Sequence, residues 1–445
     1  MAAKIDQEIP DLIVDDSFGK AYYTSAPDFQ VPDVSLTLAF KSPLIDGTPR
    51  YTALLDLYLL ILNEQLTSPL FFASIAGIDA SVTTQDLTLT LMMSGFSNKA
   101  PLLLSEITTA TRNVKPSEND FNRLKNSLKT NYINQQNAMP FMQANQRMAS
   151  AVYNDSPTPE SLQKALDNIS FNDFNEFASQ LFKQTYLEAL FAGNLSQDDA
   201  STIWESLSST FKSRSYPKDA HREKQVFILN KDSGPYAIPA ETPMQGNAVI
   251  LLIEQGASTY KSRAAQEILG TALSDDFFKT LRTKQQTGYI ARGWKRNVSD
   301  QLLQYFGVQS ATHNPDDLLS RFELFLENFV KDFSSEFSQD RFDEVKNGVI
   351  TTLTNPPTNL NDYSSRQFAF AYKHNGDFEY LKNVAKAAEE ITYDEIRQYA
   401  IEFFSRSNNR RLAVLLQGAP TGSAFQYQEL SPIALKNEGS FTTTN

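Results

Sequence analysis

The amino-acid sequence predicts an α+β fold in which two homologous units, each a largely antiparallel or mixed sheet covered by helices, are joined by a linker. Three observations predict it. At 445 residues the chain is too long for one hydrophobic core, so several domains are expected. Both halves contain short alternating apolar runs, typical of half-buried strands, and longer helical patterns. Segments far apart in the chain also repeat one another.

The repeat is visible in two pairs of segments. Residues 121–126 read FNRLKN and residues 342–347 read FDEVKN, and these segments begin 221 residues apart. Residues 169–174 read ISFNDF and residues 391–396 read ITYDEI, with starts 222 residues apart. Because the offset is nearly constant over distant segments, we expect two copies of one αβ unit of about 200 residues each.

The first unit is expected to occupy residues 1–212. A long apolar helix follows the turn residues Gly47 and Pro49, and a strand that ends at Gly193 closes the sheet. The predicted strands are 12–14, 21–23, 34–40, 87–92 and 187–192. The predicted helices are 50–66, 101–111, 118–138, 144–153, 160–168 and 172–183.

Residues 213–224 are polar, charged and without periodicity, and are therefore predicted to be the linker. The second unit, residues 225–445, then repeats the order of elements. Its predicted strands are 225–230, 248–254, 289–294, 302–310 and 411–416. Its predicted helices are 261–282 and several between 315 and 405.

Composition excludes several classes of function. The net charge of −12 argues against nucleic acid or an anionic membrane as a partner. The chain has no cysteine, which excludes disulfides, thiolate zinc sites and cysteine nucleophiles. No apolar run approaches the length of a membrane span, and no secretory apolar core follows Met1, so we expect a soluble chain without a signal peptide of its own.

The sequence contains no recognisable set of groups that would activate water. The three histidines, His221, His313 and His374, are more than sixty residues apart, so an H-x-x-E-H zinc motif cannot be present. Each is expected to be a solvated loop histidine. Nucleophile-elbow, phosphate-loop and dinucleotide motifs are also absent, and the adjacent Asp275 and Asp276 are expected to form a solvated helix face.

The segment 275–290 carries the most informative chemistry. It is predicted to be a helix end, a polar turn with Gly288 in the left-handed conformation, and the start of a strand. Arg282 and Tyr289, on either side of the turn, supply a fixed cation and a phenol. The simpler alternative is a helix end capped by solvated charges. The corresponding Ala76-Gly77-Ile78 of the first unit keeps the glycine without the cation or the phenol, which favours a function for them.

Residues 281–289 read LRTKQQTGY, which resembles the LRTKEQLGY signature of the insulinase/pitrilysin (M16) zinc peptidases. In that family the signature lies in the last of four homologous domains, so the resemblance implies that the two units are the third and fourth domains. It also implies that Arg282 hydrogen-bonds the backbone of a bound peptide and that Tyr289 donates to the carbonyl oxygen at the scissile bond. Gln285 and Thr287 depart from the signature, which places the fine positioning of the turn in question.

The resemblance implies a C-terminal, non-zinc half of a zinc metalloendopeptidase, either a fragment or a separate subunit, with no catalytic residue and no metal site of its own. Zn²⁺ and the general base would belong to an N-terminal partner half, and the two halves would enclose a peptide substrate. A bacterial relative would be periplasmic. Two alternatives stay open: a non-catalytic structural or peptide-binding subunit of the same family, and an independent hydrolase of another mechanism.

Overall fold

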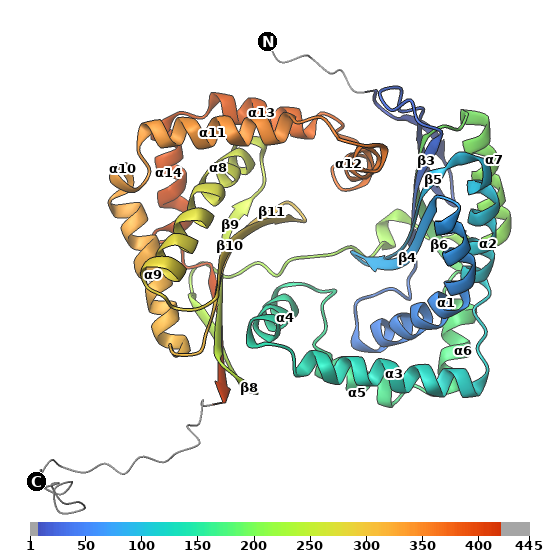
Figure 1. Cartoon of the computed structure of the whole chain (residues 1–445), viewed down its shortest axis with the longest axis horizontal. Coiled ribbons are helices and arrows are strands. Elements are labelled where there is room, and N and C mark those ends of the chain that lie inside the picture. Colours follow the sequence, from blue (N-terminus) through green and yellow to red (C-terminus); the bar gives the residue numbers. More distant parts are fainter. Residues whose placement is uncertain (1–7, 420–445) are drawn as a thin grey trace, which may run out of the picture.

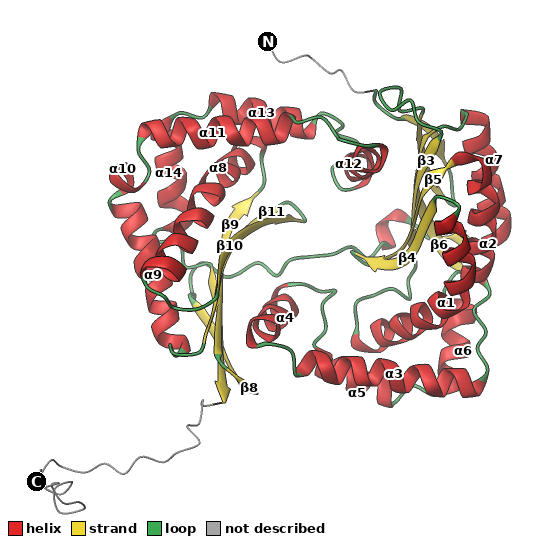
Figure 2. Ribbon diagram, in the orientation of Figure 1, coloured by secondary structure: helices red, strands yellow, loops and turns green. Residues whose placement is uncertain are grey.

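The computed structural model describes residues 8–419, so the first seven residues of one predicted unit and residues 420–445 of the other lie outside it. Two sheets lie some way apart, each with most of its helices on the side away from the other sheet (Figure 1). Helices and strands are both abundant in each half (Figure 2), which confirms the predicted α+β class. None of the helices in the described part has the length and apolar character required to cross a bilayer.

The first sheet has strand order β1-β2-β6-β3-β5-β4, and a short β7 pairs with β6. Its strands are β1 (Asp11–Asp15), β2 (Gly19–Thr24), β3 (Asp33–Lys41), β4 (Ile78–Gln85), β5 (Thr88–Phe96), β6 (Gln184–Gly193) and β7 (Arg214–Ser215). The helices of this half are α1 (Pro49–Ile75), α2 (Ala100–Arg112), α3 (Glu118–Gln136), α4 (Pro140–Val152), α5 (Pro159–Asp167), α6 (Phe171–Gln180) and α7 (Gln197–Phe211).

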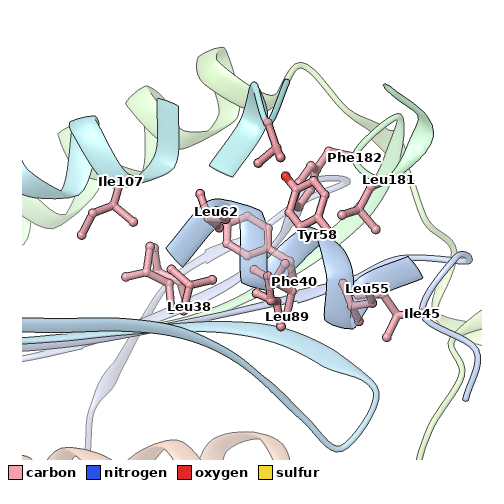
Figure 3. Close-up of a cluster of buried hydrophobic side chains, with 14 of the residues drawn as sticks. Leu38, Phe40, Ile45, Leu55, Tyr58, Leu62, Leu89, Ile107, Leu181 and Phe182 are labelled. Atoms are coloured by element: carbon pink, nitrogen blue, oxygen red, sulfur yellow. The ribbon is translucent and has the colours of Figure 1, made fainter. Parts of the chain in front are cut away.

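The first core lies between this sheet and α1. Phe40 of β3, Tyr58 of α1 and Phe182 meet there and are almost completely buried (Figure 3). Their rings pack edge to face, which suits aromatic quadrupoles. The long apolar helix that the sequence predicted is therefore the helix that covers the sheet.

The second sheet has strand order β10-β11-β9-β12-β8. Its strands are β8 (Tyr236–Gln245), β9 (Asn247–Ala257), β10 (Ile290–Val298), β11 (Gln301–Ser310) and β12 (Arg411–Ala419). Its helices are α8 (Tyr260–Phe277), α9 (Pro315–Lys331), α10 (Phe333–Glu336), α11 (Gln339–Thr354), α12 (Leu360–Tyr372), α13 (Tyr380–Glu390) and α14 (Tyr393–Phe404).

The two halves repeat in structure as well as in sequence. β2 pairs in parallel with β6 in the first sheet, as β8 does with β12 in the second, and the pairs between the long central strands are antiparallel. The short β7 of the first sheet also lies parallel to β6. A lysine at the repeated position makes the same contact in both halves. The ammonium group of Lys125 donates to the Ile169 carbonyl at 2.6 Å, and that of Lys346 donates to the Ile391 carbonyl at 2.9 Å. The residues used to detect the repeat therefore form an equivalent tertiary contact in each copy.

Each half also places one helix on the sheet of the other half. Helix α4 packs on β9 and β12, where Phe141 and Met148 join a core with Ile250. Helix α12 packs on β3 and β6, and its Tyr372 hydroxyl lies 2.8 Å from the carbonyl oxygens of Lys20 and Ala189. Both helices lie between the two sheets (Figure 1). The halves are consequently connected by two exchanged helices as well as by the linker.

Some predicted boundaries were wrong. The strand expected at 225–230 is a single bridge between Val226 and Tyr153, and the true edge strand is β8. Its two prolines, Pro239 and Pro243, argue against a strand in sequence, but proline is tolerated at a sheet edge. Strand β4 was also missed, and the linker contains β7 and a short helix at Lys218–Ala220.

Candidate functional site

Helix α8 carries the signature segment, and its end is irregular. Thr259 begins the helix with a capping box to Ser262, and Phe277 anchors its last turn in the core. The chain then widens into a π-helix, Phe278–Lys284, where one α-helix had been expected to continue to residue 282. Such π-helical turns often occur at functional sites, because they reorient side chains without ending the helix.

Three hydrogen bonds close the turn after the π-helix. The Gln285 amide donates to the Thr280 carbonyl at 3.0 Å, the bond expected of a π-turn. The amide and the hydroxyl of Thr287 both donate to the Leu281 carbonyl, at 2.9 and 2.8 Å. Thr287 is almost fully buried, so its departure from the family signature gives the turn a hydrogen bond that leucine cannot make.

Gly288 has a different role from the one predicted. The left-handed residue of the turn is Gln286, with φ of 52°, and Gly288 does not have a positive φ. A Cβ atom at Gly288 would lie 1.9 Å from the carbonyl oxygen of Gln309 on β11. Glycine is therefore required because two backbones approach closely, and the sequence pattern could not distinguish this reason from the conformational one.

Arg282 and Tyr289 lie in contact across the turn. The guanidinium carbon of Arg282 lies 4.7 Å from the centre of the Tyr289 ring and 5.0 Å from that of Phe278. The cation is thus held between two aromatic faces. Within residues 8–419 it has no carboxylate partner, and the 80% exposed Tyr289 has no hydrogen-bond partner for its hydroxyl. Both groups therefore present free donors to the solvent side of the turn.

Phe278 is the residue that sequence reasoning missed. It lies four positions before Arg282 on the same helical face, and this spacing was the unused signal for the contact. Gln285 also has a definite partner, because its side-chain oxygen accepts from Arg321 of α9 at 2.9 Å.

The adjacent aspartates had both been predicted to be solvated, and for Asp276 this prediction was wrong. Asp276 forms a two-bond ion pair with Arg341 of α11, at 2.7 and 2.8 Å, and is largely buried. Asp275 is exposed. The Asp276–Arg341 ion pair therefore fixes α8 to α11 directly before the π-helix. Asp276 takes no part in a carboxylate dyad.

Two of the three histidines are packed more closely than expected. His221 lies between the rings of Tyr186 and Tyr216, and His374 stacks on Tyr380 at 3.6 Å. Burial lowers the pKa of both His221 and His374 below the usual value. His313 is at a turn, within hydrogen-bond distance of Ser310. Over residues 8–419 no group of three or more metal-ligating side chains is placed to hold an ion.

Comparisons with known proteins identify the class. A family model for the middle or third domain of peptidase M16 matches residues 2–165. A second, for the C-terminal lobe domain 4 of PqqF-like PQQ synthases, matches residues 268–368. The Nardilysin-like protein of Arabidopsis thaliana is 26% identical over 93% of this chain and 41% of its own length. Insulin-degrading enzyme of Homo sapiens is 24% identical over 85% of this chain and 38% of its own length.

Solved structures show the same fold. Pitrilysin superposes with a TM-score of 0.82 at 18% identity, over 96% of this chain and 45% of the pitrilysin chain. A peptidase M16 inactive domain from Pseudomonas fluorescens superposes with a TM-score of 0.70 at 14% identity, over 95% of this chain and all of that one.

The duplicated αβ scaffold is thus that of a peptidase M16 protein. More narrowly, the chain belongs to the insulinase/pitrilysin family and corresponds to its C-terminal half, the third and fourth domains. The chain spans less than half the length of the curated relatives described above.

Proposed function

We propose that this chain is the non-zinc half of an insulinase/pitrilysin-type metalloendopeptidase, forming one wall of a chamber that encloses a peptide substrate. The observation that supports this most directly is the Arg282–Tyr289 pair. Its two donors are fixed by stacking, yet have no partner among the described residues. Preorganised donors of this kind bind and polarise a peptide carbonyl better than flexible ones.

In this proposal the guanidinium of Arg282 donates to a backbone carbonyl of the bound peptide near the scissile bond. The hydroxyl of Tyr289 donates to the scissile carbonyl oxygen as negative charge develops on it. Arg282 cannot lose its proton, so its role is to bind and orient. The donor set of the described residues does not fit zinc, because the histidines lie apart and no ligand cluster is found. The contribution of this chain is therefore substrate positioning and charge stabilisation, and the metal and base belong to a partner half.

A second candidate is a non-catalytic, peptide-binding or structural member of the family. The specific observation in its favour is the match to the Pseudomonas fluorescens structure described as an M16 inactive domain, all of which this chain covers. The two candidates share the fold and differ in whether Arg282 and Tyr289 act on a reacting peptide.

The deciding experiment uses the complex purified from its native source. If the proposal holds, a partner that bears H-x-x-E-H copurifies, and the complex cleaves a fluorogenic peptide. Tyr289→Phe should then lower kcat about 100-fold, as removal of one such donor does elsewhere, and Arg282→Ala should lower kcat/KM by a similar factor.

Matched controls are available on the same unit. Tyr260→Phe alters an exposed tyrosine at the other end of α8, and Arg397→Gln alters an exposed arginine on α14 that has no ion-pair partner among the described residues. Both should leave turnover unchanged. Full activity in Tyr289→Phe and Arg282→Ala would remove the site assignment, and a zinc-free complex without peptidase activity would favour the second candidate.

A further inference from the structure

Strand β10 is an open edge of the second sheet, paired with β11 alone. The hairpin loop between them is the two-residue turn Ser299–Asp300, with φ of 48° and 56°. In such a turn the flanking residues Val298 and Gln301 form a hydrogen-bonded pair, so the even-numbered residues of β10 bond to β11. The backbone groups of the odd-numbered residues point away from the sheet, and these are Ala291, Gly293, Lys295 and Asn297.

Neighbouring contacts agree with this assignment. The Ser274 hydroxyl of α8 lies 3.2 Å from the Gly293 carbonyl oxygen, on the outer side of the strand. The Gln304 side chain reaches the Trp294 carbonyl at 3.0 Å, on the β11 side. Across residues 8–419, none of the four outward amides donates a hydrogen bond. Ala291 is almost fully buried, so the accessible row consists of Gly293, Lys295 and Asn297. A row of free amides of this kind is a template for an added strand.

The α4-facing side of this edge carries free positive charge. Arg292 and Arg296 lie on it two residues either side of Trp294, and neither has a carboxylate within 4.0 Å in the described part of the chain. On the opposite face, Lys295 is neutralised by Glu267 at 2.8 Å. The equivalent edge strand of the first half, β4, contains no lysine or arginine at all. The charge is thus a feature of one copy and is not needed to build such an edge.

Aromatic packing fixes the position of one of these cations. The Arg292 guanidinium carbon lies 5.0 Å from the centre of the Phe141 ring and 4.8 Å from that of Trp294. The Trp294 ring stacks on Tyr305 at 5.1 Å with an angle of 4° between the planes. Because the side chain is already held, little rotamer freedom is lost when an anion binds it.

We propose that the open edge of β10 binds an extended peptide as an added strand and prefers acidic side chains at the positions that meet Arg292 and Arg296. Main-chain hydrogen bonds to Gly293, Lys295 and Asn297 supply the register, and the arginines select charge. The identification of this peptide as substrate rests on the proposed function, whereas the binding itself needs no partner half. If the charges served only to prevent this edge from pairing with other chains, no such binding would be expected.

The test measures the fluorescence anisotropy of a labelled, end-blocked peptide of alternating Glu and Val with the full-length chain. One analogue has Gln in place of every Glu. A second analogue carries N-methyl groups on two adjacent central residues, which removes amides from both edges of the peptide. We expect each change to weaken binding about tenfold, since a tenfold change corresponds to loss of one to two net hydrogen bonds or of a charge-assisted contact.

Variants of the protein locate the site. Arg292→Gln combined with Arg296→Gln should weaken binding of the Glu peptide about tenfold and abolish the preference over the Gln peptide. The matched control, Arg397→Gln, should bind normally. The chain has two tryptophans, so a Trp204→Phe background leaves Trp294 as the only tryptophan, and its emission should change on binding. Melting temperatures of all variants confirm that they are folded.

The proposal is overturned if the N-methylated peptide binds as well as its parent, if the double arginine variant binds normally, or if the Glu peptide does not bind at about 1 mM, a threshold of very weak affinity. These failures are distinct from failure of the proposed function. Loss of turnover in Tyr289→Phe with no edge binding would reject this inference alone. Edge binding with full turnover in Tyr289→Phe would reject the site assignment alone.

Discussion

Arg282 takes part in none of the ion pairs formed among residues 8–419. Asp276, six residues before Arg282, pairs with Arg341 of α11 instead. Stacking on Phe278 and Tyr289 then holds the guanidinium without neutralising it. A free cation maintained in this way is suited to a neutral peptide carbonyl, which competes poorly with carboxylates for an arginine.

The histidines allow a prediction at the same scale. Burial lowers the folded-state pKa of His221 and His374, whereas their unfolded-state pKa is about 6.5. As the pH falls below that value, the unfolded chain binds more protons than the folded chain, so these residues cost stability on the acidic side. We expect His221→Asn combined with His374→Asn to lose less stability than the unmodified protein between pH 7.5 and about 5.5.

Urea unfolding at the two pH values measures this difference. The comparison uses the change with pH and not the absolute stability, because loss of the Tyr380 stack affects the variant at every pH. Buried carboxyls such as Asp56 have a raised pKa, which acts in the opposite direction, but they are present in both proteins and cancel. Identical pH dependence in the two proteins would show that the histidines are not the groups responsible.

At the scale of elements, the end of α8 depends on a close approach between backbones. The turn after the π-helix brings Gly288 against the Gln309 carbonyl of β11, which leaves no room for a side chain. We expect Gly288→Ala to lower the free energy of unfolding by about 1–3 kcal/mol, the usual cost of overpacking, and to displace the Arg282 turn. The measurements are urea unfolding and, with the partner half, peptide turnover.

The chain supplies an opposite control for this substitution. Gly348 lies inside α11 and has nothing within 4 Å of a built Cβ, so Gly348→Ala should raise stability by about 0.5–1 kcal/mol. If Gly288→Ala were equally harmless, the turn would have to be mobile enough to move away from β11, and a fixed position for Arg282 would be untenable.

At the scale of the whole molecule, the exchanged helices α4 and α12 make each sheet depend on the other half. Phe141 is buried against the second sheet, and Tyr372 bridges β2 and β6 of the first. The covalent link between the halves is therefore not the only connection. This arrangement keeps the Arg282 turn and the β10 edge in a defined position relative to the first unit.

We expect the halves to stay together when the connection between them is cut. A specific protease site inserted after Lys231, in an exposed turn, allows cleavage of the folded protein. The two fragments should elute together in size-exclusion chromatography, because both exchanged helices retain their contacts. Phe141→Ala combined with Tyr372→Ala should allow the cleaved halves to separate, since a buried Phe→Ala substitution alone costs about 3–5 kcal/mol. Separation of the unsubstituted halves would contradict the arrangement.

The sequence by itself determined the two-fold repeat, most of the helices, the central strands and the position of the signature turn. These follow from local periodicity and from similarity between segments, which need no knowledge of distant contacts. The resemblance of residues 281–289 to the family signature singled out Arg282 and Tyr289, and their role as substrate donors stays a proposal.

Only the tertiary structure decided the rest. The exchange of α4 and α12, the proline-containing edge strand β8, the stacking of Phe278 on Arg282 and the true reason for Gly288 all depend on groups distant in sequence or on a helical register that widens locally. Local patterns cannot specify such features, because the same residues are equally compatible with a solvated turn until the opposing backbone or side chain is in place.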